Sequence, residues 1–136
     1  MKILGVDFGD SRTGYAVSDP LGFGATTLPA CKEKSMVKVA DRTAELAKEL
    51  GVEMIVLGFP KNMNGTIGPR GEKTQAFAKM LEERLSIPVK LWDERLTTVS
   101  AHNLMNETNV RGKKRKESVD SISAAYLLQS YLDSIK

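Results

Sequence analysis

The chain has 136 residues, a formal net charge of +3 and one cysteine. This length suits a single domain with its own hydrophobic core. Hydrophobic residues make up 41% and charged residues 27%, as in globular proteins, and no apolar run reaches the roughly 18 residues of a membrane span. The lone Cys31 excludes an intramolecular disulfide framework. Because the chain opens directly on a strand pattern without the features of a secretory signal, we expect a cytoplasmic protein with no membrane partner.

The first part of the chain predicts three antiparallel strands. Apolar and alternating residues indicate strands over Lys2–Phe8 and Thr13–Ser18, joined by a turn at Gly9–Arg12. A third strand follows at Ala25–Cys31. Pro29 predicts an edge position for it, because proline cannot donate a hydrogen bond to a ladder. We therefore expect a three-strand meander.

From Ser35 onward the apolar residues take a helical spacing, which predicts a helix that ends at Gly51. Met54–Leu57 is a short apolar run of the kind found in buried parallel strands. Gly58–Gly71 is rich in glycine, proline and asparagine and predicts a loop. The chain thus changes here from hairpins to helical crossovers.

The remaining elements complete an α/β pattern. A second helix is expected to end before Pro88, and Val89–Trp92 is the expected fifth strand. Thr97–Asn106 predicts a short helix, and Ser118–Ile135 a long one with Ser118 as its N-cap. The order predicts one domain over residues 1–136, a five-stranded mixed sheet with an antiparallel meander and parallel crossovers, flanked by helices. That order matches the ribonuclease H-like architecture.

Three acidic residues stand in unusual contexts. Asp7 lies within the apolar run of the first strand, Glu94 follows the fifth strand, and Asp120 lies on the apolar stripe of the last helix. A buried carboxylate is costly unless a metal, a cation or hydrogen bonds compensate it. In the expected fold the first and fourth strands are neighbours and the last helix crosses near their ends. The three acids therefore predict a metal site.

Each acid also has a structural explanation. Asp7 could cap the turn that follows it, and Glu94 or its neighbour Asp93 could pair with Arg95, so which of the two carboxylates faces a metal stays open. Asp120, if it lies in the first turn of its helix, would be favoured there by the helix dipole.

Basic residues near these acids are the expected substrate contacts. Arg111–Lys116 is nearly all basic, and its Lys113, Lys114, Arg115 and Lys116 could form either a solvated loop or a phosphate-binding arm. Arg12 and Arg95 could contact phosphate as well. Their alternative is an ion pair with Asp10, Asp19 or Glu94.

Four motifs resemble those of the YqgF (RuvX) family, in the ribonuclease H-like superfamily. They are DFGDSRTGYAVSD at residues 7–19, GFPKNMNGT at 58–66, DERLTT at 93–98, and VDSISA at 119–124 followed by LLQ at 127–129. Members of this family are described as Holliday junction resolvases and as nucleases of pre-16S ribosomal RNA.

The resemblance implies a nuclease with a two-metal site of Mg²⁺ or Mn²⁺, in which Asp7 bridges the ions and Glu94 and Asp120 each hold one. Hard ions of this kind prefer carboxylate oxygens. The implied partners are nucleic acid, with precursor ribosomal RNA preferred to branched DNA, and the ribosomal particle. The protein is expected to be a monomer or weak homodimer.

Two other functions fit part of the pattern. A non-catalytic nucleic-acid-binding module would keep the fold and the basic run. An ATPase resembling actin or the sugar kinases would use Asp7–Gly9 and Gly14 as a phosphate loop, but those proteins contain two copies of the fold and this chain has room for one.

Overall fold

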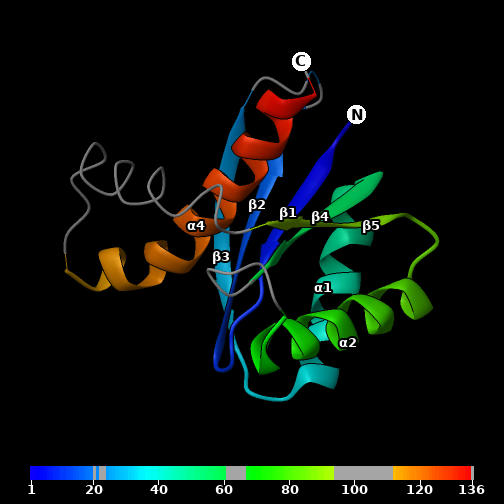
Figure 1. Ribbon diagram of the computed structural model, residues 1–136. Helices are drawn as coiled ribbons and strands as arrows, with labels where there is room; N and C mark the ends of the chain where they lie inside the picture. The colour runs from blue at the N-terminus through cyan, green and yellow to red at the C-terminus, as the bar shows by residue number, and fades with distance from the viewer. Residues whose placement is uncertain (20, 22–23, 61–66, 94–111, 136) are drawn as a thin grey trace.

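The structure is a computed structural model that describes residues 1–19, 21, 24–60, 67–93 and 112–135; between 112 and 120 it describes the backbone only. It is an α/β fold in which a five-stranded mixed sheet lies between α1 and α2 on one face and α4 on the other (Figure 1). Both the fold class and the number of strands agree with the sequence prediction. No helix in these described ranges is long and apolar enough to cross a membrane.

The sheet has the strand order β3-β2-β1-β4-β5. Antiparallel pairing joins β1 to β2 and β2 to β3, whereas β4 runs parallel to β1 and β5 runs parallel to β4. The carboxyl ends of β1, β4 and β5 therefore meet at one edge of the sheet. The strands are β1 (Ile3–Asp7), β2 (Arg12–Ser18), β3 (Ala25–Lys32), β4 (Met54–Phe59) and β5 (Val89–Asp93).

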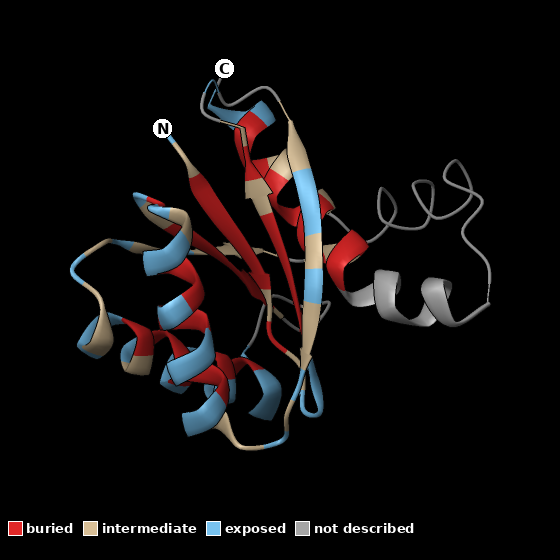
Figure 2. Cartoon of the chain, turned by 180° about the vertical axis from the view of Figure 1, so that it is seen from behind, coloured by how far each residue is buried: buried red, intermediate tan, exposed pale blue. Residues whose placement is uncertain are grey.

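The meander ends in an edge strand, as Pro29 predicted. β3 pairs only with β2, and the register shifts between Thr13 and Tyr15 because β3 contains one extra residue there. Figure 2 shows β3 alternating between exposed and partly buried residues, while the central strands are buried. A proline on this strand removes a donor that a central strand would need.

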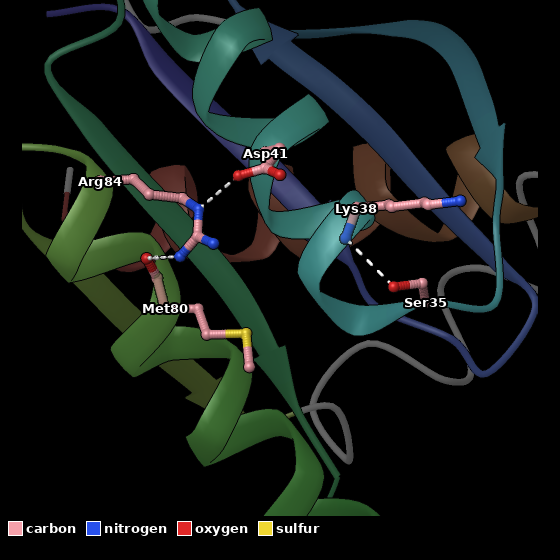
Figure 3. A network of polar contacts seen from close by, with 5 residues as sticks. All are labelled: Ser35, Lys38, Asp41, Met80 and Arg84. Carbon is pink, nitrogen blue, oxygen red and sulfur yellow. Dashed lines mark hydrogen bonds and ion pairs between the residues drawn. The ribbon is translucent and has the colours of Figure 1, made fainter.

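Helix α1 (Met36–Leu50) begins and ends where the sequence predicted. The Ser35 side chain accepts a hydrogen bond from the Lys38 amide at 3.4 Å, and Gly51 closes the helix with a φ of 66°, in the left-handed region. Arg84 of α2 then joins the two helices, since its Nε donates to Asp41 at 2.7 Å (Figure 3).

Helix α2 (Pro69–Arg84) and β4 both extend into the segment predicted as a loop. β4 continues through Gly58 to the buried Phe59, and α2 starts at Pro69, so the predicted loop is wrong at both ends. Proline suits the first turn of a helix because its missing N–H would have no partner there. Glycine and proline thus favour a loop in the sequence, whereas Gly58 lies within a strand and Pro69 begins a helix.

Helix α4 (Gly112–Ser134) starts earlier than predicted. Ser118 is not its N-cap, and the basic run Lys113–Lys116 lies in its first turns. Lysine and arginine have high helix propensity, so a run of them is compatible with helix when the charges face solvent. Figure 1 shows these first turns (orange) extending away from the sheet. The predicted helix Thr97–Asn106 lies outside the described residues.

The core has one layer on each face of the sheet. Leu4, Val6 and Leu57 pack toward α1 and α2 in one cluster, while Ile3 and Val56 pack with α4 in the other. Consecutive residues of β1 therefore point to opposite helices, as the period of a strand requires.

The α4 layer depends on a glycine in β1. A Cβ added to Gly5 would lie 2.9 Å from the Cβ of Leu128 and 3.0 Å from the carbonyl oxygen of Ala124. Only glycine lets the helix approach the strand this closely.

Gly5→Ala is expected to lower the free energy of unfolding by about 1–3 kcal/mol, because the helix must move or strain to accept the methyl group. Urea denaturation measures this change. Gly24→Ala is the matched control, since its Cβ would find no atom closer than 3.9 Å. Equal stability of the two variants would contradict the proposed close approach.

Candidate functional site

Asp7 is the last residue of β1 and lies on the α4 face of the sheet. Ile3 belongs to the cluster around α4, Gly5 faces Leu128, and strand alternation places Asp7 on the same side. The residue is partly buried and makes interactions within the protein. A carboxylate is thus held at the edge where β1, β4 and β5 end.

Glycines surround Asp7 on this face of the sheet. Gly14 of β2 pairs directly with Asp7, and Gly58 of β4 follows Leu57, the partner of Val6. Gly5 lies two residues before Asp7 on the same strand. The three sheet positions next to Asp7 on the α4 face are therefore glycines and carry no side chains.

The end of β1 is fixed from the opposite face. Phe8 stacks on Phe77 of α2 with ring centroids 4.2 Å apart and planes only 7° from parallel. Both rings are buried. The following turn also needs Gly9, because a Cβ there would meet the carbonyl oxygen of Arg12 at 2.4 Å. Asp7 therefore sits between a rigid strand and an anchored turn.

The backbone of α4 brings Asp120 toward this region. Asp120 is one turn before Ala124, whose carbonyl lies over Gly5, and it directly precedes Ser121, whose hydroxyl donates to the Leu28 carbonyl in β3. Its helix starts eight residues earlier, at Gly112, and has no acidic residue in its first turn. The helix dipole therefore does not explain an acid at position 120, because the stabilisation of acids by the dipole fades after the first turn.

At the end of β5, Trp92 and Asp93 point to opposite faces. The Trp92 ring meets Tyr131 of α4 edge to face at 5.4 Å, and its Nε1 donates to Ser130 at 3.2 Å, so Trp92 is part of the α4 layer. Asp93 is paired in register with Phe59, whose ring faces α2. Asp93 therefore lies on the face opposite Asp7. Glu94 lies outside the described residues.

The cations predicted near the site have different surroundings. Arg12 begins β2, is exposed, and shares the α4 face with Gly14 and Asp7 by strand alternation. Neither Asp10 nor Asp19 pairs with it in the described structure: Asp10 pairs with Lys73 at 3.6 Å, and Asp19 accepts hydrogen bonds from the amides of Leu21 and Gly24. Of the ion pairs considered for Arg12, those with Asp10 and Asp19 are not found among the described residues, and Glu94 lies outside them.

The remaining predicted cations lie partly or wholly outside the described residues. Lys113, Lys114, Arg115 and Lys116 have a helical backbone in the first turns of α4, and their side chains lie outside the described part of the structure, as does the whole of Arg95.

Two other reactive side chains are structural. Burial raises the pKa of Tyr15 to about 12, and its hydroxyl is 2.6 Å from that of Thr43 inside the α1 layer. Burial also raises the pKa of the Cys31 thiol above its usual value. Raised pKa values keep both groups protonated near neutral pH, so neither suits a nucleophile.

Across the described side chains no three metal-ligand residues gather in one place. Of the three predicted ligands Asp7, Glu94 and Asp120, only Asp7 has its side chain within the described part of the structure. Sequence reasoning also missed two features, the glycines around Asp7 and the face of Asp93. Strand alternation is the signal that could have identified both features, if it is counted along β1 from Gly5 and along β5 from Trp92.

These features define an α/β protein of the ribonuclease H-like class, with an acidic residue at the end of its first strand. Two solved structures share the fold: "T. thermophilus RuvC in complex with Holliday junction substrate" (TM-score 0.64, 14% identity, covering 100% of this chain and 97% of that chain) and the Fowlpox virus resolvase with its Holliday junction DNA (TM-score 0.63, 15% identity, 99% of each chain).

Sequence comparison gives the family. Residues 1–134 match the family model described as "RuvX: Holliday junction resolvase". Proteins from Clostridium novyi (50% identity, 99% of this chain and 100% of that protein) and Acetivibrio thermocellus (51% identity, 98% and 96%) are named "Putative pre-16S rRNA nuclease". The chain belongs to the RuvX family, as its four motifs predicted.

Phe77→Ala is expected to lower the free energy of unfolding by about 3–5 kcal/mol, because it removes a buried ring and releases the turn after Asp7. Thermal or urea denaturation measures the loss. Gln75→Ala, an exposed position on the same helix, serves as the control and should stay within about 0.5 kcal/mol of wild type. A small effect of Phe77→Ala would show that the stack does not anchor β1.

Proposed function

We propose that this protein is a metal-dependent endonuclease that processes the 5′ end of precursor 16S ribosomal RNA. The observation that carries the proposal is the position of Asp7, a partly buried carboxylate among glycines at the carboxyl edge of β1 and β4, beneath α4. Membership of the RuvX family and relatives named as pre-16S rRNA nucleases support the choice of chemistry and substrate.

The residues around Asp7 fit a divalent ion. Carboxylate oxygens are the ligands that Mg²⁺ and Mn²⁺ prefer. No side chain projects from Gly5, Gly14 or Gly58 into the area above the carboxylate, so hydrated ions and a phosphate find no obstacle from these sheet positions. In this proposal Asp7, Glu94 and Asp120 would together hold the divalent ions.

Bound divalent ions would supply an activated water and neutralise charge on the phosphodiester. The chain's own groups do the positioning. Asp7 is held by the strand and by the Phe8–Phe77 stack, so its carboxylate keeps one location. Because α4 starts at Gly112, the helix dipole does not account for Asp120, and this supports a role for Asp120 in the metal site.

Substrate contacts come from the cations that flank this edge. Arg12 shares the face of Asp7 and has no acidic partner in the described structure, which leaves its guanidinium available for a phosphate. The helical run Lys113–Lys116 and Arg95 are proposed to bind the backbone on either side. Binding through such groups weakens as salt rises, because phosphate contacts release counterions.

Holliday junction resolution is the second candidate, and the name of the matched family model favours it. A resolvase needs a symmetric dimer to cut two strands, whereas an RNA-processing nuclease works as a monomer on one strand. The relatives at about 50% identity carry the ribosomal RNA name, and we place that substrate first.

The deciding experiment compares cleavage of a short precursor ribosomal RNA end and of a synthetic four-way DNA junction in Mg²⁺ or Mn²⁺. Asp7→Asn is expected to bind substrate as wild type does and to cut it at least about 100-fold more slowly, because only transition-state stabilisation is lost.

Metal-dependent RNA cutting that disappears in Asp7→Asn supports the processing nuclease. Paired cuts across the junction support the resolvase instead. Wild-type protein that binds both nucleic acids and cuts neither would contradict the enzyme and leave a binding module.

A second comparison separates the two neighbouring acids at the end of β5. Glu94→Gln is expected to abolish cleavage and weaken Mn²⁺ binding, while Asp93→Asn keeps most of both, because Asp93 lies on the α2 face away from Asp7. Calorimetric Mn²⁺ titration and cleavage rates measure the two effects. The reverse ranking would assign the ligand to Asp93.

A further inference from the structure

The outer edge of β5 offers unused hydrogen-bonding groups. The Ile55 amide donates to the Pro88 carbonyl at 3.0 Å, so the backbone of Pro88, Lys90 and Trp92 points toward β4. The N–H and C=O groups of Val89 and Leu91 then point away from the sheet. These backbone groups of Val89 and Leu91 make no hydrogen bond within the described structure. β5 can therefore accept an added strand.

A groove runs beside this edge, on the face away from Asp7. It has a volume of about 530 Å³, and Leu91 of β5 together with Ala76 and Ala78 of α2 forms its apolar part. Gln75 and three charged residues complete its lining. An extended peptide paired with β5 would place every second side chain over this groove.

The charged lining of the groove is mainly acidic. Glu72 and Glu82 line it together with Lys79, which gives these three side chains a net charge of −1. All three are exposed, and none forms an ion pair within the part of the chain that the structure describes. By contrast, the α1–α2 junction nearby uses its acid, Asp41, to hold Arg84. The glutamates of the groove are thus free to meet basic side chains.

We propose that the edge of β5 and the groove beside α2 bind an extended segment of a protein partner, by strand addition, with the pattern basic–x–apolar–x–basic. Glu72 and Glu82 are ten residues apart on α2, or about 15 Å along the helix. Residues i and i+4 of a strand are about 13 Å apart and share a face. Two basic side chains therefore reach the two glutamates while the central side chain packs on Leu91 and the alanines.

This surface is separate from the proposed nuclease site. Asp7, Gly14 and Arg12 lie on the α4 face, and the groove lies on the α2 face at the free edge. An acidic groove also repels phosphate, which excludes nucleic acid as the favoured occupant.

The test uses the full-length protein and a labelled nine-residue peptide with the core Lys-Thr-Val-Thr-Lys, with fluorescence anisotropy as the readout. We expect saturable binding that the matching Glu-Thr-Val-Thr-Glu peptide lacks. The double variant Glu72→Gln, Glu82→Gln should bind about five- to tenfold more weakly, as two exposed ion pairs are lost. Glu45→Gln with Glu49→Gln, two exposed glutamates of α1, is the control and should bind normally.

Amide hydrogen exchange tests the strand addition itself. The Leu91 amide should exchange at least tenfold more slowly when the basic peptide is bound, and Leu91→Pro should abolish binding because it removes that donor. If Leu91→Pro does not fold, the exchange measurement decides.

Equal binding of both peptides, or an unprotected Leu91 amide, would overturn the proposal. Tighter binding of a single-stranded RNA probe at this groove would also overturn it. So would concentration-dependent dimers in sedimentation that Leu91→Pro dissociates, since the occupant would then be a second copy of the chain.

Discussion

The contact between α4 and Gly5 is the constraint on which the rest of the structure depends. The Cα of Gly5 lies so close to Leu128 and the Ala124 carbonyl that no larger residue fits between them. This contact sets how far α4 stands from the sheet and which of its turns crosses β1. Asp120 is one turn from the contact along α4, and Asp7 is two residues from it along β1. One close approach therefore places both acids of the proposed site near the same sheet edge.

The two faces of the sheet carry different charges, and this divides the surface between different partners. The α4 face has Arg12 beside Asp7 and a basic run at the start of α4, a combination that suits a phosphate backbone once metal ions offset the acids. The α2 face at β5 has two glutamates that form no ion pair within the described residues, beside an apolar strip. Under the two proposals, a nucleic acid and a basic peptide would use different surfaces of the protein.

The fold could be predicted from the sequence because its signals are local and consistent. Strand alternation, the Ser35 cap, Gly51 and Pro29 each specify an element or its place without tertiary information. Where prediction was wrong, at Gly58, Pro69 and the start of α4, a residue type is compatible with two structures: here the glycine lies within a buried strand, the proline begins a helix, and the lysines form helical turns. Neighbouring elements decide between such structures, and the sequence of one segment does not contain them.

The site was harder to predict than the fold because chemistry depends on which way a side chain points. The sequence favoured Glu94 over Asp93 as the metal ligand but left the choice between the two open, since adjacent acids after a strand look alike. In the sheet, adjacent residues point to opposite faces. Because Trp92 contacts α4, the face of every other residue of β5 follows from it by alternation. Asp93 is thereby directed to the side of Phe59 and away from Asp7. A single aromatic contact thus fixes the face on which Asp93 lies, which composition and spacing could not show.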